Sequence, residues 1–173
     1  KVLDAEPVNA VSLPGGYVYV NRGLLEKVES DDELAGVIAH EIGHIAARHS
    51  MKRLQSSLGA GLLQALAVGA GTDGQAVRGA SIAMTQLFLA YARGDELLAD
   101  RLGVKSMQRA GYDPYAMARF LEKLKKVHRE KPPKGSYLRT HPYISDRIRV
   151  VHETIEGKLR YEDYLNIEEE NIQ

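Results

Sequence analysis

Two histidines one helical turn apart constrain this chain more than any other feature of its sequence. Residues 40–44 read His-Glu-Ile-Gly-His, inside a strong helix signal that Ser30 and Glu33 open with a capping-box pattern. Apolar residues recur through this segment at helical spacing. On an α-helix the two imidazoles lie about 40° apart around the axis, so both can reach one metal ion. The sequence therefore predicts a helix from residue 31 to about 53 that carries two metal ligands, His40 and His44.

Glu41 has a different task, because it lies about 100° around the helix from His40. We expect it to act as a general base on a metal-bound water rather than as a ligand. A third histidine ligand on the same helix is out of register, since Ala47 and Ser50 occupy the positions that would need glycine and histidine. His49 falls on another face of the helix. We interpret it as structural or exposed.

A carboxylate on a second helix is the alternative third ligand. Residues 93–109 are predicted to be helical, because Gly111 is a stop signal. Glu96 lies in this segment, and Asp100 follows it one turn later on the same face. A histidine that binds a metal usually donates its other N–H to a carboxylate. Glu96 as ligand and Asp100 as the partner of a ligand histidine therefore form a coherent pair.

Composition limits the remaining possibilities. The 173 residues fit one domain, residues 1–173, with room for a closed site. Lysine plus arginine equals aspartate plus glutamate, 23 of each, so no overall field favours nucleic acid as a partner. The absence of cysteine excludes thiolate zinc sites and cysteine nucleophiles. Because no targeting signal follows Lys1, we expect the chain to be a fragment of a longer one.

The rest of the sequence indicates an α+β fold that is mostly helical. Residues 9–14 and 16–20 predict a small antiparallel hairpin. The uncharged run 54–72 contains glutamine, serine and four glycines, and is interpreted as a soluble or interfacial helix rather than a membrane span. Further helices are expected at about 113–129 and at 145–156, where Ser145 is the expected cap. The acidic tail 168–170 is expected to be a solvated, fraying end.

Taken together, these segments resemble the HtpX-like and CAAX-prenyl-endopeptidase-like zinc metallopeptidases of the gluzincin type, in particular their soluble bacterial branch. The resemblance covers nearly the whole chain and departs from the family pattern at Val11 and Ala92, neither a presumed ligand. The residues that carry it are Asn9-Ala10, Leu13-Pro14-Gly15-Gly16, residues 40–44, Glu96 with Ala99-Asp100, Gly111-Tyr112-Asp113-Pro114, and Thr140-His141-Pro142 with Arg147.

The resemblance implies a zincin-like fold with a small antiparallel sheet beside the active-site helix. It also implies one Zn²⁺ per chain at His40, His44 and Glu96, with Asp100 orienting a ligand histidine. His141 becomes a hydrogen-bond donor to the transition-state oxyanion, although its ring could instead swing onto the open coordination position.

Two further assignments concern the substrate. Arg147 is expected either to bind a substrate carbonyl or to form an intramolecular ion pair. Asn9 and Ala10 resemble the edge strand on which an extended peptide is laid antiparallel.

We expect a zinc-dependent endopeptidase that hydrolyses unfolded or damaged proteins, which it binds in extended form. The alternative is a zinc-stabilised, chaperone-like module that binds peptides with little cleavage, and the intact Glu41 argues against it. The resemblance favours the bacterial cell envelope, in particular the periplasm. Any membrane or envelope association is expected to come from segments outside this fragment.

Overall fold

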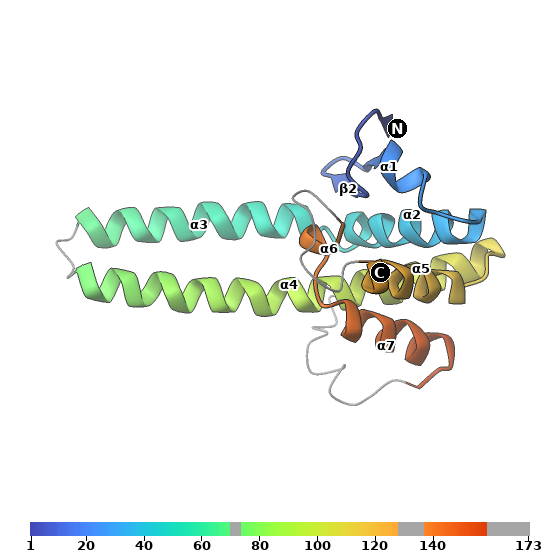
Figure 1. Ribbon diagram of the computed structural model, residues 1–173. Helices are drawn as coiled ribbons and strands as arrows, with labels where there is room; N and C mark the ends of the chain where they lie inside the picture. Colours follow the sequence, from blue (N-terminus) through green and yellow to red (C-terminus); the bar gives the residue numbers. More distant parts are fainter. Residues whose placement is uncertain (70–73, 128–136, 159–173) are drawn as a thin grey trace.

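The computed structural model describes residues 1–69, 74–127 and 137–158, and gives only the backbone for 63–64, 67–69 and 74–91. A helical body carries a small sheet on one side, and two long helices run side by side away from it (Figure 1). The elements are β1 Val2–Leu3, β2 Ala10–Leu13, β3 Tyr17–Asn21, α1 Arg22–Leu25, α2 Asp31–Ala46, α3 His49–Gly69, α4 Gly74–Ala110, α5 Tyr115–Val127, α6 Tyr137–Thr140 and α7 Ile144–Ile155. The predicted α+β, mostly helical fold is confirmed.

α2 begins where its capping signal places it. Ser30 has extended backbone angles, and its side chain accepts a hydrogen bond from the backbone N–H of Glu33 at 3.2 Å. The Glu33 carboxylate in turn accepts from the backbone N–H of Glu29 at 2.8 Å. Three acidic residues in the first turn also stabilise the helix, because their negative charges lie at the positive end of the helix dipole.

The predicted helix from 31 to about 53 is in fact two helices. α2 ends at Ala46, and α3 starts at His49. Between them Arg48 has a φ of 54°, in the left-handed region that glycine usually occupies. The sequence gives no sign of this break, because Arg48 is an ordinary helix-forming residue.

α2 and α4 cross at very close range. A Cβ atom on Gly43 would lie 2.6 Å from the backbone oxygen of Ala99. One on Gly103 would lie 3.2 Å from the backbone nitrogen of His40. Glycine at both positions therefore allows the two helices to bring His40, His44 and the 96–100 segment together. α4 ends before Gly111 as predicted, but it begins at Gly74, nineteen residues earlier than expected.

The sheet is mixed rather than purely antiparallel. β2 and β3 form the predicted antiparallel hairpin, with Ala10 opposite Val20 and Leu13 opposite Tyr17. β1 pairs in parallel with β3, so the strand order is β1-β3-β2. β1 was not predicted, because a strand of two residues is too short to show a sequence pattern and its partner lies far along the sequence. β2 is an edge strand of this sheet, next to α2.

The last helices complete the body. Asp113 accepts a hydrogen bond from the backbone N–H of Tyr115 at 3.0 Å, as its predicted position before α5 requires. α7 follows Tyr143, whose φ is 64°, and the expected cap Ser145 lies inside the helix instead. The predicted extension of α5 to 129 and the tail 168–170 lie outside the described residues. The main core residues of the body are Val37, Val104, Phe120, Leu121 and Val151.

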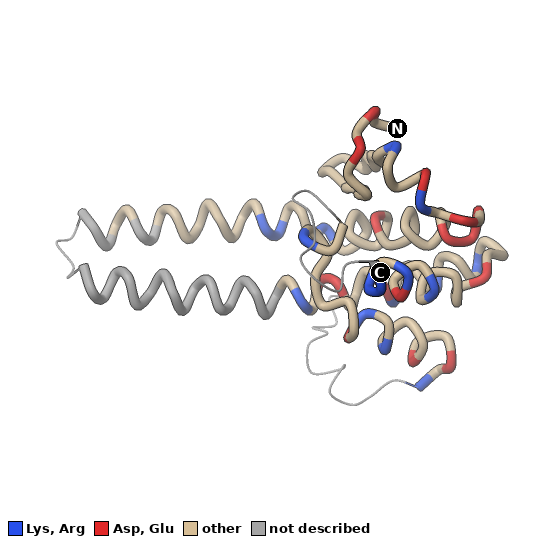
Figure 2. The backbone as a smooth tube through the Cα atoms, viewed as in Figure 1, with Lys and Arg blue, Asp and Glu red and all other residues tan. Residues whose placement is uncertain are grey.

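α3 carries an exposed apolar stripe. Leu54, Leu58, Leu62 and Leu66 recur every four residues, and each is more than half exposed. Charged residues gather on the body, whereas the described part of α3 beyond Arg53 carries none (Figure 2). Among the described residues, no helix is both long enough and apolar enough to cross a membrane.

Candidate metal centre and active site

Both histidines of the motif turn the same ring atom toward one point. The Nε2 atoms of His40 and His44 are 3.0 Å apart, and the rings meet edge to face with centroids 4.6 Å apart. Both side chains are buried. The one-turn spacing on α2 therefore produces the converging pair that the sequence predicts.

α4 adds a carboxylate to this pair. Glu96 Oε2 is 3.3 Å from His40 Nε2, and Glu96 Oε1 is 3.4 Å from His44 Nε2. The carboxylate thus spans both rings, as the close crossing of α2 and α4 permits. Burial raises the pKa of Glu96, but its hydrogen bonds with His141, His40 and His44 lower it more. The group stays ionised and can serve as an oxygen ligand.

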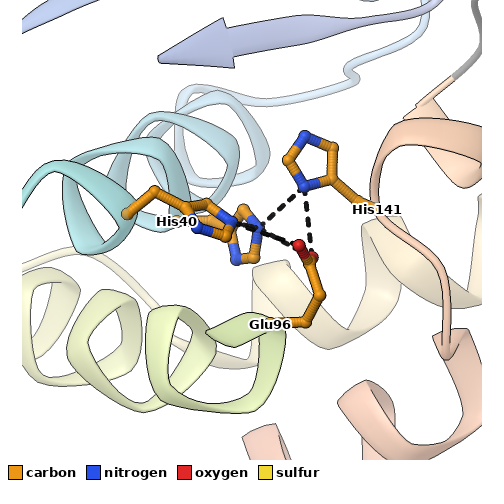
Figure 3. Close-up of side chains that lie close together, drawn as sticks. His40, Glu96 and His141 are labelled. Carbon is orange, nitrogen blue, oxygen red and sulfur yellow. Dashed lines mark hydrogen bonds and ion pairs between the residues drawn. The ribbon is translucent and has the colours of Figure 1, made fainter. Parts of the chain in front are cut away.

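His141 approaches from the segment after α6, opposite His40 (Figure 3). Its Nδ1 is 3.1 Å from Glu96 Oε2 and 3.3 Å from His40 Nε2. Its Nε2 is 3.3 Å from Glu41 Oε1. Burial lowers the pKa of His141 despite the neighbouring carboxylates, so the neutral ring is favoured.

The donor set fits a zinc ion. His40, His44, Glu96 and His141 each offer one ligand atom, and these atoms all lie within 4.8 Å of one another. Imidazole nitrogen and carboxylate oxygen are ordinary zinc ligands. Both carboxylate oxygens of Glu41, which are buried, also lack a hydrogen-bond partner among the described residues. Buried oxygens of this kind are expected where a cation, water or substrate completes the site.

Asp100 links His40 to a fully buried arginine. Its Oδ1 lies 2.7 Å from His40 Nδ1, on the ring edge opposite the converging Nε2 atoms. Arg147 donates to both Asp100 oxygens at 2.8 Å, in a bidentate pair. Burial raises the pKa of Asp100, but the charges of Arg147 and His40 lower it to about 2.

Arg147 therefore lies in the protein interior. Its side chain has no exposed surface, and it forms the intramolecular ion pair that was one of the two readings of the sequence. The contact with a substrate carbonyl, the other reading, stays a prediction.

Asn9 and Ala10 are also buried, so their side chains brace the site instead of facing solvent. Asn9 Oδ1 accepts hydrogen bonds from its neighbour's backbone N–H at 3.0 Å and from Thr140 Oγ1 at 3.1 Å. The next residues of β2, Val11 and Ser12, line a cleft of about 120 Å³. The same cleft is lined by Glu41, His44, His49, Ser50, Arg53, Thr140 and His141.

Sequence reasoning missed Tyr137 and underused His49. Tyr137 stacks on His141, with centroids 4.4 Å apart and planes 29° apart, and its hydroxyl accepts from Arg147 at 3.3 Å. His49 is buried, as one of the two interpretations held, and its Nδ1 lies 2.8 Å from that of His44. Burial and nearby positive charges lower the pKa of His49 to about 3. The available sequence signal was proximity alone, since His49 follows His44 by five residues and Tyr137 precedes His141 by four.

A buried His-His-Glu cluster beside a second buried glutamate, Glu41, on a mostly helical α+β body, defines the class of protein as a metallopeptidase domain. The model of Peptidase family M48 matches residues 1–155, and the chain belongs to this family. The resemblance inferred from the sequence is thereby confirmed, since HtpX-like proteins are members of the same family.

Relatives in bacteria and in a plant share this domain. The chain is 32% identical over 160 residues to the beta-barrel assembly-enhancing protease of Yersinia pestis, an alignment that covers 85% of this chain and 32% of that protein. It is 37% identical over 153 residues to the mitochondrial metalloendopeptidase OMA1 of Arabidopsis thaliana, with 87% and 30% covered. The metalloprotease LoiP of Escherichia coli is 29% identical over 161 residues, with 88% and 61% covered. The chain thus spans about a third of the length of the first two relatives.

Proposed function

We propose that residues 1–173 form a single catalytic domain of a zinc-dependent endopeptidase that cleaves unfolded or damaged polypeptides. The observation that carries this proposal is the convergence of His40, His44 and Glu96 on one point, with the fully buried Glu41 beside it. Family membership supports zinc as the metal and hydrolysis of peptide bonds as the reaction.

In this proposal His40, His44 and Glu96 hold one Zn²⁺ ion, and Asp100 orients His40 through its Nδ1. Zinc at such a site supplies a Lewis acid that polarises a carbonyl oxygen and lowers the pKa of a water molecule. Glu41 accepts the proton of the attacking water and passes it to the leaving amine nitrogen. The environment of Glu41 supports this role, because neither of its oxygens has a hydrogen-bond partner among the described residues, and a carboxylate free of hydrogen bonds can take up a proton.

His141 is proposed to donate a ring N–H to the oxyanion that develops on the substrate carbonyl. Its position opposite His40 and within 3.3 Å of Glu41 supports this role. The same ring lies among the ligand atoms of the cluster, which equally supports the alternative in which His141 closes the site until substrate displaces it.

Extended peptides are proposed to bind along β2. In the described sheet β2 pairs with β3 on one side only, and its Val11 and Ser12 lie along the cleft that contains Glu41 and His44. A peptide added antiparallel to this edge would be held by main-chain hydrogen bonds, which select conformation over side-chain sequence. This mode suits unfolded substrates.

The names of the bacterial relatives support a role in the cell envelope, and we propose a periplasmic location on that basis. The chaperone-like alternative, peptide binding without cleavage, is disfavoured by the retained Glu41 next to the cluster.

Hydrolysis of an unfolded protein such as casein tests the proposal. The zinc-loaded chain should release peptides, a chelator should stop the reaction, and added zinc should restore it. Chelator-resistant cleavage would contradict a zinc mechanism, whereas tight binding of casein without cleavage would favour the chaperone-like alternative.

A further inference from the structure

His49 is a buried titratable side chain that the proposed mechanism does not use. Resting on the proposed zinc site, we propose that His49 and Asp95 act as positioning residues that fix the ring orientation and proton of the ligand His44. The two residues would do for His44 what Asp100 and Arg147 do for His40.

The contacts form a continuous chain away from the cluster. His44 turns Nε2 toward His40 and Glu96, and its Nδ1 lies 2.8 Å from His49 Nδ1. On the far edge of the His49 ring, Nε2 lies 3.3 Å from Asp95 Oδ1. His49 is 2% exposed, so water cannot readily replace it as the partner of His44.

The positions of the protons in this series of contacts follow from the proposed binding of His44 to zinc. A neutral His44 that offers Nε2 to zinc must carry its proton on Nδ1, and that N–H then donates to its partner among the described residues, His49 Nδ1. His49 must then carry its own proton on Nε2, which faces Asp95 Oδ1. Each ring therefore fixes the tautomer of the next. The Asp95 carboxylate, which can only accept, determines that every N–H in the series points toward Asp95.

The break between α2 and α3 builds this arrangement. A helix continued past Ala46 would carry residue 49 to another face, away from His44. The left-handed turn at Arg48 instead starts α3 at His49 and folds its ring edge-on against His44, with centroids 5.0 Å apart. Strained backbone is commonly retained where it positions a functional group.

The two ligand histidines are thus supported in parallel ways. Behind His40 lie Asp100 and then Arg147. Behind His44 lie His49 and then Asp95, whose other oxygen accepts from Arg53 Nε at 3.3 Å. We call the series of contacts His44–His49–Asp95 the relay. Asp95 and Glu96 are adjacent on α4, so one turn of this helix supplies both the third ligand and the end of the relay.

Metal affinity tests the relay without relying on catalysis. Zinc affinity would be measured by competition with a chelating dye, and ligand geometry by the visible spectrum of the Co²⁺-loaded chain. His49→Phe keeps the ring volume but removes the acceptor, and should weaken zinc binding by about 10 to 100-fold and alter the Co²⁺ bands. His49→Asn keeps an acceptor where Nδ1 stands and should retain most of the affinity. Met51→Ala, at an exposed position close to His49 but outside the cleft and the relay, is the matched control and should match wild type.

Asp95→Ala provides a second test at a less buried position, and should lower zinc affinity by a smaller factor than His49→Phe. A folded His49→Phe with wild-type zinc affinity and Co²⁺ spectrum would overturn the relay. Should His49→Phe fail to fold, unchanged affinity in Asp95→Ala would overturn it instead. If the wild-type chain itself binds no zinc, the proposed function fails first, and the relay fails with it.

Discussion

Glu41 is fully buried, and neither of its carboxylate oxygens has a hydrogen-bond partner among the described residues. Leaving such a group unpaired in a protein interior costs stability. His141 Nε2 lies 3.3 Å from Glu41 Oε1, and both residues line a cleft of about 120 Å³. A residue kept in so unfavourable a position is best explained by a role in proton transfer.

Glu41→Gln should therefore preserve the fold and the bound zinc but abolish peptide hydrolysis. The amide has the same volume as the carboxylate, but it cannot accept a proton from water at neutral pH. Zinc content, circular dichroism and peptide release would be measured on one preparation. Turnover at the wild-type rate would refute the general-base role.

Arg147→Ala should destabilise the metal-free protein by about 3–5 kcal/mol, because it leaves the buried Asp100 carboxylate without its bidentate partner. Arg149→Ala, on the same helix, removes a partly exposed arginine paired with Glu153 and should cost less than about 1 kcal/mol. Urea unfolding measures both. A stable Arg147→Ala variant whose only defect is a raised KM would favour the substrate-binding interpretation.

Asp100 should make the free energy of unfolding depend on pH in the acid range. Its pKa in the folded protein is about 2, below the ordinary value of 3.8, so the folded state binds a proton less readily than the unfolded state. The resulting stabilisation is fully present above about pH 4 and is lost as the pH falls toward 2. In urea unfolding of the metal-free chain, Asp100→Asn should flatten this decline, and a smaller slope should remain from the other carboxyls whose pKa is lowered in the folded protein, among them Glu96 and Asp113. Equal slopes in the two proteins would contradict the assignment.

Short-range spacing explains which site residues could be predicted. His40, Glu41 and His44 follow from one helical turn, and Glu96 with Asp100 follows from the need for a third ligand and its orienter. Tyr137 and Asp95 could not be predicted, because their contacts depend on how separate segments pack. Arg147 was left with two readings for the same reason, since only burial distinguishes an internal ion pair from a substrate contact.

At the scale of elements, the site depends on the close crossing of α2 and α4. Gly43 lies against the α4 backbone at Ala99, and the contact leaves no room for a side chain. The geometry of His44 relative to Glu96 is therefore set by a backbone contact. Two helices held this closely keep the three proposed ligands, His40, His44 and Glu96, within reach of one ion.

Gly43→Ala should push α2 and α4 apart and weaken zinc binding, because the added Cβ would meet the Ala99 backbone oxygen at 2.6 Å. Gly94→Ala is the matched control on α4, since nothing lies within 4 Å of a Cβ added there. The control should stabilise the helix by about 0.5–1 kcal/mol. Zinc affinity and thermal unfolding would be compared. Equal zinc affinity in the two variants would show that α2 and α4 can move apart without disturbing the ligands, and would contradict this prediction.

Helix existence was easier to predict than helix ends. The capping pattern at Ser30 and the stop at Gly111 were correct, because both are local signals. The break at Arg48 has no such signal, and the many glycines before residue 93 obscured the early start of α4. Ser145 failed as a cap because the left-handed Tyr143 starts α7 instead. The parallel pairing of β1 depends on residues far apart in sequence.

At the scale of the whole molecule, the site lies where three distant segments meet: α2, α4 and the turn after α6. The long helices α3 and α4 extend from this junction (Figure 1). The first residues of α3 line the same cleft as Val11 and Ser12 of β2. In the proposed binding mode, a substrate aligned on β2 would lie along the cleft that Glu41 and His44 also line.

The most direct measurement of the central claim is anomalous X-ray diffraction from crystals of the zinc-loaded chain, recorded on both sides of the zinc absorption edge. The account predicts one strong peak per chain, about 2.0–2.1 Å from Nε2 of His40 and His44 and within about 2.2 Å of a Glu96 oxygen. A peak bound elsewhere, or no peak between α2 and α4, would contradict it.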